Sequence, residues 1–427
     1  MMGNTRTFKP TNGNIYVTLT GEPIYIKGNI QAINKDATFT VTGGGALSGE
    51  PVTFQVEMNN TTAEALDFTL EVEDQSYALN AAAGQTKLQS VVVNGMDEPG
   101  TRIVKGVLKA GGQAIGMLQY AAAVDSSETV QIRPVMNGTE PLSQSIKVQI
   151  RNHSKINALP VHRIDWQFGT LSGHQDVNQV LQPDSTEIFD IALQSVELGK
   201  SFLTNIDVAY GNNKTYVYKG NIDFNPVYRG TLNVDGNPDP LIVAKSPTID
   251  LSKGNVKMSG YQGADDLSGS VWLNYDNDYF YVTAKIKDNI HAYPATDVNM
   301  WNNDSIQLAI SNGLPGEDPK YYEYGISQTS AGAQIYRWIT PVGGAKGLVT
   351  NGEVQVTRDE GQKLTMYELA LPWSELVPIM TESGVFNFSL LVNDNDGNQR
   401  RGFIEWGGGI GDGKAPSKFR SMQWIQE

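Results

Sequence analysis

Two loops in the second half of the chain carry residue types that bind a hard cation. Asp276 and Asp278 flank an asparagine in the first loop, and Asp394 and Asp396 alternate with asparagines in the second. Calcium prefers carboxylate and amide oxygens as ligands, so the sequence predicts these four aspartates as calcium ligands. Neither loop continues into a helical calcium loop with its terminal glutamate. Because aspartate and asparagine also favour turns, a turn is the favoured interpretation of either loop taken alone.

The tryptophans are the second group with a recognisable chemistry, and six of the seven lie after position 228. An indole either fills a core, where it buries about 150–250 Å², or lies exposed and offers its flat face to the C–H face of a sugar ring. Trp301 follows a polar loop, which favours exposure and stacking; a rim residue that packs a sandwich is an equal alternative. Trp338 fits either role. The tryptophans expected in a core are Trp272, Trp373 and Trp406.

Two charged residues near these groups could hold a sugar. Asp304 precedes the apolar run Ile306–Ile310. Its carboxylate could orient a sugar hydroxyl or, equally, cap the turn before that strand. Arg400 follows the second acidic loop and could bind hydroxyls or a carboxylate of a ligand, with a solvated strand edge as the favoured alternative.

No residue pattern predicts catalysis, so the chain is not expected to be an enzyme. Hydrolysis of a glycoside needs two carboxylates about 5–9 Å apart across one bond. Glu323, Glu368 and Glu405 are available, but none lies in a catalytic motif. The absence of cysteine excludes thiolate zinc sites and cysteine nucleophiles. The four histidines are scattered and accompany no nucleophile motif.

The charge of the chain narrows the classes of partner. The net charge is −14 and the pI about 4.8, so a nucleic acid would be repelled. No apolar stretch approaches the roughly 18 residues that cross a bilayer, and we expect no membrane insertion. A neutral glycan or a cation fits the charge better, although many proteins are acidic simply to remain soluble.

Short strands must position these residues, because apolar and polar side chains alternate along many segments. Examples are Asn14–Thr20, Val52–Met58, Ser145–Ile150 and Tyr279–Ile286. Such alternation indicates half-buried strands. No long stretch has the 3.6-residue apolar period of a helix, and the best helical candidate is the short turn Pro372–Leu376. The sequence therefore predicts an all-β chain of sandwiches or barrels.

An internal similarity divides the chain. Val52–Val72 and Ile146–Trp166 each read as a strand, an asparagine-containing turn and a second strand, and further strands follow both in the same order. A duplication is the preferred explanation, and the spacing common to any two sandwiches is the alternative. We predict tandem β-sandwiches: two immunoglobulin-like domains over 30–130 and 131–227, and a larger sandwich over 228–427.

Several motifs of the predicted third domain resemble, in order, those of family 9 carbohydrate-binding modules. Each motif is short, and together they extend over almost the whole domain. They are Asn233–Gly236, Trp272–Val282, Asn299–Leu308, Tyr367–Trp373, Phe386–Asp394, Phe403–Trp406 and Pro416–Phe419.

The resemblance implies a β-sandwich with bound calcium and a slot in which two tryptophans grip the end of a glycan chain. By position, Trp301 matches one wall and Asn393 matches a hydroxyl-binding amide. Gln307 stands where the family often has a ligand-contacting glutamate. The loop Gly407–Lys414 should hold the other wall but contains no aromatic residue.

The missing aromatic residue leaves three possibilities for the slot between two tryptophans. The slot is open on one side, its second wall is rebuilt from Trp338 or Tyr336, or the slot is absent. We predict a non-catalytic carbohydrate-binding accessory region that binds a polysaccharide or oligosaccharide. The predicted ligand-binding residues are Trp301, Asp304, Gln307, Trp338, Asn393 and Arg400. The alternative is a structural or adhesive cell-surface spacer without sugar binding; a β-sandwich hydrolase or lyase ranks third.

The first residues bear on the context of the chain. Gly13–Gly28 resembles the closing strands of the small β-domain that follows the catalytic barrel of bacterial glycoside hydrolases, and an ordinary hairpin is the alternative. The resemblance implies that residues 1–29 are a linker or the last strands of an upstream domain, and that a catalytic domain lies further upstream in a secreted multidomain polysaccharide-degrading enzyme. The start of the chain has no apolar signal segment. We nevertheless expect an extracellular or cell-surface location.

Overall fold

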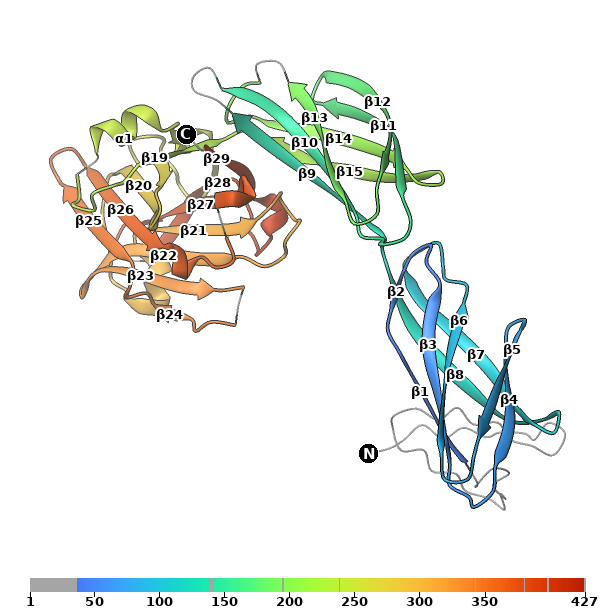
Figure 1. The fold of residues 1–427 in the computed structure, drawn as a ribbon. Coiled ribbons are helices and arrows are strands. Elements are labelled where there is room, and N and C mark those ends of the chain that lie inside the picture. Colours follow the sequence, from blue (N-terminus) through green and yellow to red (C-terminus); the bar gives the residue numbers. More distant parts are fainter. Residues whose placement is uncertain are drawn as a thin grey trace. The chain divides into compact units, whose positions relative to one another are not determined.

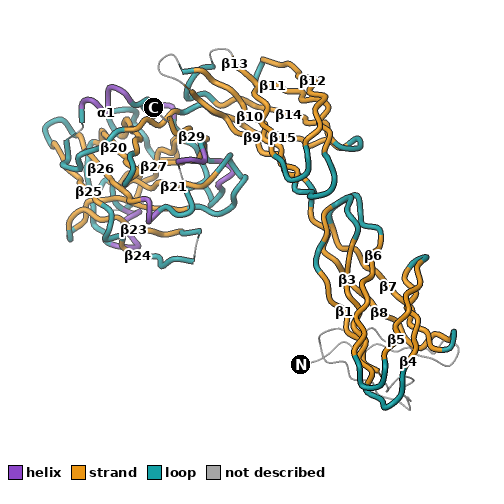
Figure 2. The backbone as a smooth tube through the Cα atoms, viewed as in Figure 1, coloured by secondary structure: helices purple, strands orange, loops and turns teal. Residues whose placement is uncertain are grey.

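The computed structural model describes residues 37–425 except 138–141, 194–195, 238, 342, 380 and 398. Strands dominate these residues, and the helices among them are short (Figures 1 and 2). The single α-helix described, α1, covers Pro240–Lys245. No helix in this part of the chain is long and apolar enough to span a membrane. The predicted all-β class is therefore confirmed, whereas the segments 1–29 and Gly13–Gly28 lie outside the described residues.

The described residues form two compact units, one with residues 37–129, 151–159 and 180–186, and the other with the remaining described residues. The first unit pairs two sheets whose inward side chains make one core, including Phe54, Met58 and Leu70. One sheet has the order β1 (Ala37–Gly43), β3 (Val52–Asn60), β6 (Thr86–Val93). The other has the order β2 (Ala46–Leu47), β8 (Gln113–Asp125), β7 (Gly100–Ala110), β4 (Leu66–Val72), β5 (Gln75–Ala81).

Two further sheets follow along the chain. One has the order β13 (Thr186–Leu193), β10 (Ser143–Asn152), β9 (Glu128–Asn137). The other has the order β12 (Leu171–Leu181), β11 (Leu159–Phe168), β14 (Ser201–Tyr210), β15 (Lys214–Asp223). Tandem β-sandwiches are thus confirmed as the architecture. The limits 30–130, 131–227 and 228–427, and the immunoglobulin-like character of the first two domains, remain predictions.

The remaining strands, from residue 226 onward, join into one 14-stranded sheet. Its main path runs β24, β23, β22, β21, β27, β29, β16, β19, β20, β26, β25, with β17 on β19 and with β28 between β27 and β18. The strands are β16 (Pro226–Arg229), β17 (Ile249–Asp250), β18 (Asn255–Met258), β19 (Leu267–Tyr275), β20 (Tyr279–Asp288), β21 (Ser305–Asn312), β22 (Tyr322–Thr329), β23 (Gly332–Ile339), β24 (Gly347–Leu348), β25 (Glu353–Asp359), β26 (Leu364–Pro372), β27 (Val385–Asn395), β28 (Arg400–Trp406) and β29 (Arg420–Ile425). We refer to this sheet and its loops as the C-terminal sandwich.

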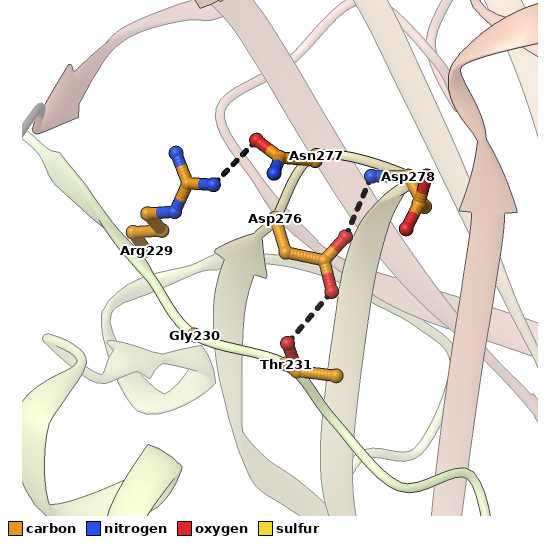
Figure 3. Close-up of a pocket in the computed structure, with 6 residues that line it drawn as sticks. All are labelled: Arg229, Gly230, Thr231, Asp276, Asn277 and Asp278. Carbon is orange, nitrogen blue, oxygen red and sulfur yellow. Dashed lines mark hydrogen bonds between the residues drawn. The ribbon is translucent and has the colours of Figure 1, made fainter.

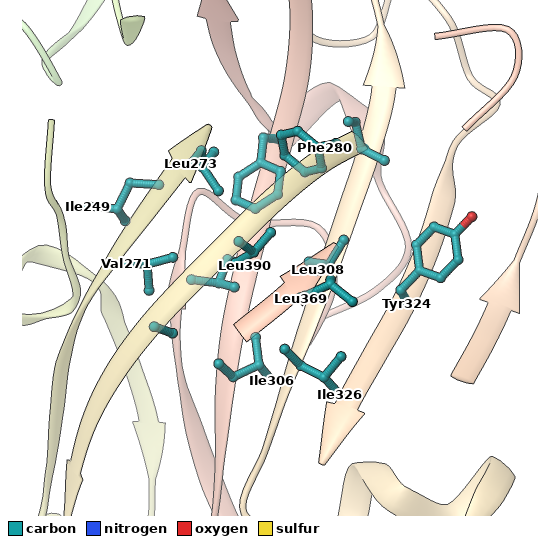
Figure 4. Close-up of a cluster of buried hydrophobic side chains, with 14 of the residues drawn as sticks. Ile249, Val271, Leu273, Phe280, Ile306, Leu308, Tyr324, Ile326, Leu369 and Leu390 are labelled. Carbon is teal, nitrogen blue, oxygen red and sulfur yellow. The ribbon is translucent and has the colours of Figure 1, made fainter. Parts of the chain in front are cut away.

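One apolar core holds the C-terminal sandwich together, because both halves of the sheet contribute to it (Figure 4). Leu308 and Leu390 come from one half, and Phe280 and Leu369 from the other. Trp272, Trp406 and Trp424 are buried, and Trp373 packs partly buried against the core. The core positions predicted for Trp272, Trp373 and Trp406 are therefore confirmed.

The motif Asn233–Gly236 is fixed by a buried carboxylate. Glu368 Oε2 accepts hydrogen bonds from the backbone N–H groups of Asp235 at 2.9 Å and Gly236 at 2.7 Å. Gly236 has a φ of +86°, which favours glycine. Two motifs that lie far apart in the sequence thus meet because Glu368 binds a turn, and this carboxylate has a structural role.

Side chains on β21, β22 and β27 that point away from the core are buried as well. Along β21, Ile306 and Leu308 belong to the core, so the alternate residues Ser305 and Gln307 face the other way. Both are nevertheless buried, at 0% and 7% exposure. Buried polar groups need hydrogen-bond partners. We call this side of β21, β22 and β27 the outer face, and the hydrogen bonds among its polar side chains define the candidate site.

Candidate functional site

A chain of hydrogen bonds crosses the outer face of the C-terminal sandwich. Asn393 Nδ2 on β27 donates to Ser305 Oγ at 2.9 Å and to Gln307 Oε1 at 3.2 Å. Gln307 Nε2 donates to Glu323 Oε1 on β22 at 3.1 Å. These contacts follow from the antiparallel register, in which Ser305 lies opposite Asn393. The structure therefore brings the predicted residues Gln307 and Asn393 together.

Arg400 connects this chain to Trp301. Its Nε donates to Asn393 Oδ1 at 2.5 Å, and its guanidinium lies 5.7 Å from the centre of the Trp301 ring and 4.7 Å from that of Phe403. Both distances suit cation–π contacts. Burial lowers the pKa of Arg400. Trp301 is 38% exposed, so its indole is partly open to solvent. The segment before it, expected to be a loop, belongs to a 3-10 helix that also contains Trp301.

Trp338 lies on the same outer face. Its ring rests on Gly325, where an added Cβ would come within 2.2 Å of the indole. In register, Gly325 lies between Gln307 on β21 and Tyr336 on β23, so the Trp338 indole is next to the polar chain. Trp338 Nε1 also donates to the Val298 carbonyl at 3.0 Å. Val298 belongs to η2 (Asp297–Asn302), the 3-10 helix that carries Trp301.

The loop after β28 covers the other part of this face. Glu405 Oε1 accepts hydrogen bonds from the backbone N–H groups of Ile410 at 2.7 Å and Gly411 at 3.3 Å. The loop then covers apolar side chains of the sheet in a small second core, made of Ala309, Tyr321, Leu391, Phe403, Ile410 and Phe419. A packed cover therefore stands where the resemblance places a second aromatic wall.

The same loop contributes a cation to the hydrogen-bonded side chains of the outer face. Lys414 Nζ lies 2.7 Å from Glu323 Oε1. Burial raises the pKa of Glu323, and the neighbouring Lys414 and Gln307 oppose that rise. From the sequence, Glu323 is considered only as a carboxylate available for glycoside hydrolysis, and Lys414 is not identified. Strand alternation places Glu323 and Gln307 on the same face of the sheet. Only the pairing of β21 with β22 brings their side chains together.

A second cluster, of carboxylates, lies at the end of β20. Ligand atoms of Asp288, Asp394 and Asp396 lie within 4.8 Å of one another, as do those of Asp288, His291 and Asp304. Burial, with help from neighbouring carboxylates, raises the pKa of Asp288 to about 7 and that of Asp394 to about 6. Burial lowers the pKa of His291 to about 4, so its ring is neutral at pH 7.

Several ligand atoms of this cluster lack hydrogen bonds. Both carboxylate oxygens of Asp394 and both ring nitrogens of His291 are buried without one. Arg401 lies near by, with Nη1 3.4 Å from Asp394 Oδ2. Carboxylates gathered with unsatisfied oxygens are the donor set that calcium prefers, so Asp288, Asp394 and Asp396 fit a calcium ion, whereas the ring nitrogens of His291 do not. The sequence predicts Asp394 and Asp396 as ligands, and the structure adds Asp288 beside them.

Asp304 belongs to this carboxylate cluster. Its side chain binds backbone groups and not the polar side chains beside Trp301 and Trp338. Its Oδ2 accepts from the backbone N–H of Ala292 at 2.5 Å, and its Oδ1 accepts from that of Asn395 at 2.7 Å. It is 2% exposed. Asp304 thus joins the start of the Trp301 loop to the end of β27, and its predicted contact with a sugar remains a prediction.

Asp276 and Asp278 lie at the opposite end of β20, about 30 Å from Asp288 for an extended strand of this length. They line a cavity of about 260 Å³ with Arg229 and Thr231, and Figure 3 shows these side chains. Asp276 Oδ1 accepts from the backbone N–H groups of Asp278 and Tyr279, and Oδ2 from the hydroxyls of Thr231 and Tyr281. Asp276 Oδ1 therefore binds the turn and Oδ2 binds hydroxyls outside it, and the calcium role of Asp276 and Asp278 stays a prediction.

A comparison with protein-family models found a match within the C-terminal sandwich. Residues 234–423 match the family model described as carbohydrate family 9 binding domain-like. A family 9 carbohydrate-binding module from Caldicellulosiruptor kristjanssonii in complex with cellotriose is 14% identical, with a TM-score of 0.37, covering 48% of this chain and 95% of that one. The module's glucose complex is 15% identical, with a TM-score of 0.35, covering 48% and 97%. The comparison with curated proteins found no match.

Proposed function

We propose that the C-terminal sandwich, whose residues 234–423 resemble a carbohydrate family 9 binding domain, binds a neutral polysaccharide or oligosaccharide. The observation that carries this proposal is the exposed Trp301 indole beside the hydrogen-bonded side chains of Arg400, Asn393 and Gln307. An exposed aromatic face supplies apolar contact, and fixed polar groups orient the ligand. The cellotriose and glucose complexes of the similar modules support the same ligand class.

In this mechanism the two indoles provide the stacking surfaces. Trp301 offers a face beside Arg400, and Trp338, held on Gly325, rebuilds the second wall from β23 instead of the loop after β28. Asn393 is fully buried and binds Gln307 and Arg400, so it would hold these two side chains in place for sugar hydroxyls. Because the polar groups are already positioned, little side-chain entropy is lost on binding.

The proposed role is non-catalytic. Glycoside hydrolysis needs two carboxylates facing one bond. Glu368 binds the turn at Gly236, Glu405 binds the loop at Ile410, and Glu323 pairs with Lys414. We propose that the chain is an accessory region of a secreted polysaccharide-degrading protein, where binding would raise the local concentration of substrate. The exposed indole argues against the alternative of a spacer without a binding site.

We also propose a structural calcium ion at the carboxylate cluster. Asp288, Asp394 and Asp396 would hold it, with His291 and Asp304 adjacent. When bound, the ion would neutralise the carboxylates. It would also join β20, β27 and the loop that carries Trp301 (Asn289–Asp304).

Affinity electrophoresis of the full chain tests the proposed function. Gels containing hydroxyethylcellulose, xylan, mixed-linkage β-glucan or galactomannan cover the neutral polysaccharides, and polygalacturonate is the acidic comparison. We expect retardation in at least one neutral gel and none with polygalacturonate, because the chain has a net charge of −14. Free migration in every gel would remove the binding proposal and leave the spacer.

Gly325→Ala tests the Trp338 wall without changing a polar group. The added methyl would occupy space now filled by the indole, 2.2 Å away, so the ring must move and the affinity for the retarding polysaccharide should fall about tenfold. Gly116→Ala is the matched control, since a Cβ at this strand glycine meets nothing within 4 Å. Equal retardation of Gly325→Ala and the wild type would show that Trp338 is not a wall.

A further inference from the structure

One run of chain passes directly from the sheets before residue 224 into the C-terminal sandwich. We refer to the two sheets that contain β9 to β15 as the middle sheets. β15 ends at Asp223 and β16 begins at Pro226. Phe224 is fully buried, with its ring centroid 6.0 Å from that of Phe168 on β11, whereas Val227 lies in the core of the C-terminal sandwich. These described residues leave no length for a flexible linker.

The strand β16 holds a central place in the sheet of the C-terminal sandwich. It pairs in parallel with β29 on one side and with β19 on the other. In the described order of strands, β16 alone lies between these two, so this part of the sheet is continuous only when β16 is in place. The residues matched to the family begin at 234 and do not include this strand. The segment that leaves the middle sheets therefore completes the next sheet.

Buried hydrogen bonds join the end of β15 to β29. The Asp223 carbonyl accepts from Ser421 Oγ at 2.8 Å and from Gln423 Nε2 at 3.0 Å. The Asn225 backbone N–H donates to Gln423 Oε1 at 2.7 Å, and Asn225 Nδ2 donates to the Ser421 carbonyl at 2.8 Å. Ser421 and Gln423 are both 0% exposed. Partial separation of these segments would leave buried polar groups without partners, which is unfavourable.

Two ion pairs add to this interface. Arg420 Nε lies 3.0 Å from Asp223 Oδ2, and Arg420 Nη2 donates to the Gly199 carbonyl at 2.6 Å. Arg133 on β9 donates from Nη1 to both carboxylate oxygens of Glu317, at 3.0 and 2.8 Å. Glu317 lies between β21 and β22, so a different loop of the C-terminal sandwich makes this second contact. Contacts at two separate places restrict rotation about the connection at residues 224–227.

We infer that the middle sheets and the C-terminal sandwich fold and open as one cooperative unit, whose interface is made chiefly by β15, β16 and β29. The residues of this interface all belong to the second compact unit. Domains of one chain that share only a small interface usually move independently, but here a strand and a buried hydrogen-bond network are shared. The smallest stable segment that carries the outer face therefore begins at β9, and not at residue 234. This inference does not depend on sugar binding.

Native-state hydrogen exchange of the full chain in rising urea, followed by mass spectrometry of its peptides, tests the cooperative unit. Peptides from β14 in the middle sheets and from β27 in the C-terminal sandwich should show the same free energy of opening and the same dependence on urea. Different values for β14 and β27 in the wild type would overturn the inference.

Val208→Ala and Val56→Ala are a matched pair of variants for the same measurement. Both valines are 0% exposed, the first on β14 and the second on β3 of the first unit. Val208→Ala should speed exchange in β14 and β27 peptides by the same factor, about tenfold, because lost packing in one part destabilises the whole unit. Val56→Ala should leave β27 at the wild-type rate.

Acceleration of β14 alone by Val208→Ala would overturn the inference, and so would acceleration of β27 by Val56→Ala. If Val208→Ala does not accumulate as folded protein, Ile206→Val gives the same comparison. Ile206 is also 0% exposed on β14, and the loss of one methylene group is a milder change.

Discussion

Replacing Trp301 by alanine should weaken binding of the retarding polysaccharide by about 30-fold, which corresponds to about 2 kcal/mol. The indole is 38% exposed, so it presents a face to a ligand while its other contacts hold it in place. The Arg400 guanidinium, 5.7 Å from the ring centre, would lose one of its two aromatic neighbours and with it part of the restraint on the Asn393 amide. Affinity electrophoresis over a series of polysaccharide concentrations measures the change.

Trp166→Ala is the matched control for Trp301→Ala. Trp166 lies on β11, is half-buried, and rests on Gly173, as Trp338 rests on Gly325. It is far along the chain from the proposed site, so its loss should leave retardation unchanged. If the two variants migrate alike, the stacking surface is not at Trp301. A Trp301→Phe variant with intermediate retardation would support a requirement for an aromatic face.

Removing calcium should lower the thermal stability of the C-terminal sandwich. At a calcium concentration 100 times its dissociation constant, the ion would stabilise the folded state by about 2.7 kcal/mol. For a domain of this size, that corresponds to an increase in Tm of about 5–10 °C. Differential scanning calorimetry in calcium and in a chelator measures the shift. In Asp394→Asn the shift should disappear, because both oxygens of Asp394 are buried without hydrogen bonds and are the best-placed ligands.

Asp278→Asn provides the control, since Asp278 lies at the other end of β20 and its loss should leave the calcium shift intact. Loss of the shift in Asp278→Asn, with retention in Asp394→Asn, would place the ion at the first acidic loop instead. The Trp301 loop is bounded by Asp288 and Asp304, both members of the cluster. Chelation should therefore also reduce polysaccharide retardation, and undiminished retardation would show that the ion does not order this loop.

Local sequence was sufficient for the strands and for the family resemblance. A strand with one face on a core needs an apolar side chain at every second position. This two-residue period can be recognised in the sequence without knowledge of tertiary contacts. The motifs of the C-terminal sandwich were recognisable for a related reason. Several of these motifs supply contacts that stabilise the fold, such as the Glu368 carboxylate that binds the turn at Gly236.

The two acidic loops show where local sequence fails. Asp276–Asp278 and Asp394–Asp396 have the same residue types at the same spacing. The first loop satisfies Asp276 within its own hairpin and with Thr231. In the second, Asp394 is buried beside Asp288, more than a hundred residues away in sequence. Burial and distant carboxylates decide which loop can hold a cation, and neither property can be read from the loop itself.

The sequence by itself determined the all-β class, the position of Trp301 directly after a polar segment, and the candidate amides Gln307 and Asn393. Only the tertiary structure decided how these residues are used. The register of β21, β22, β23 and β27 joins Gln307 to Asn393 and Glu323 and sets the Trp338 ring on Gly325. The physical reason is that strand alternation specifies which face a side chain occupies, whereas its neighbours on that face come from other strands, through pairings that depend on the whole sheet.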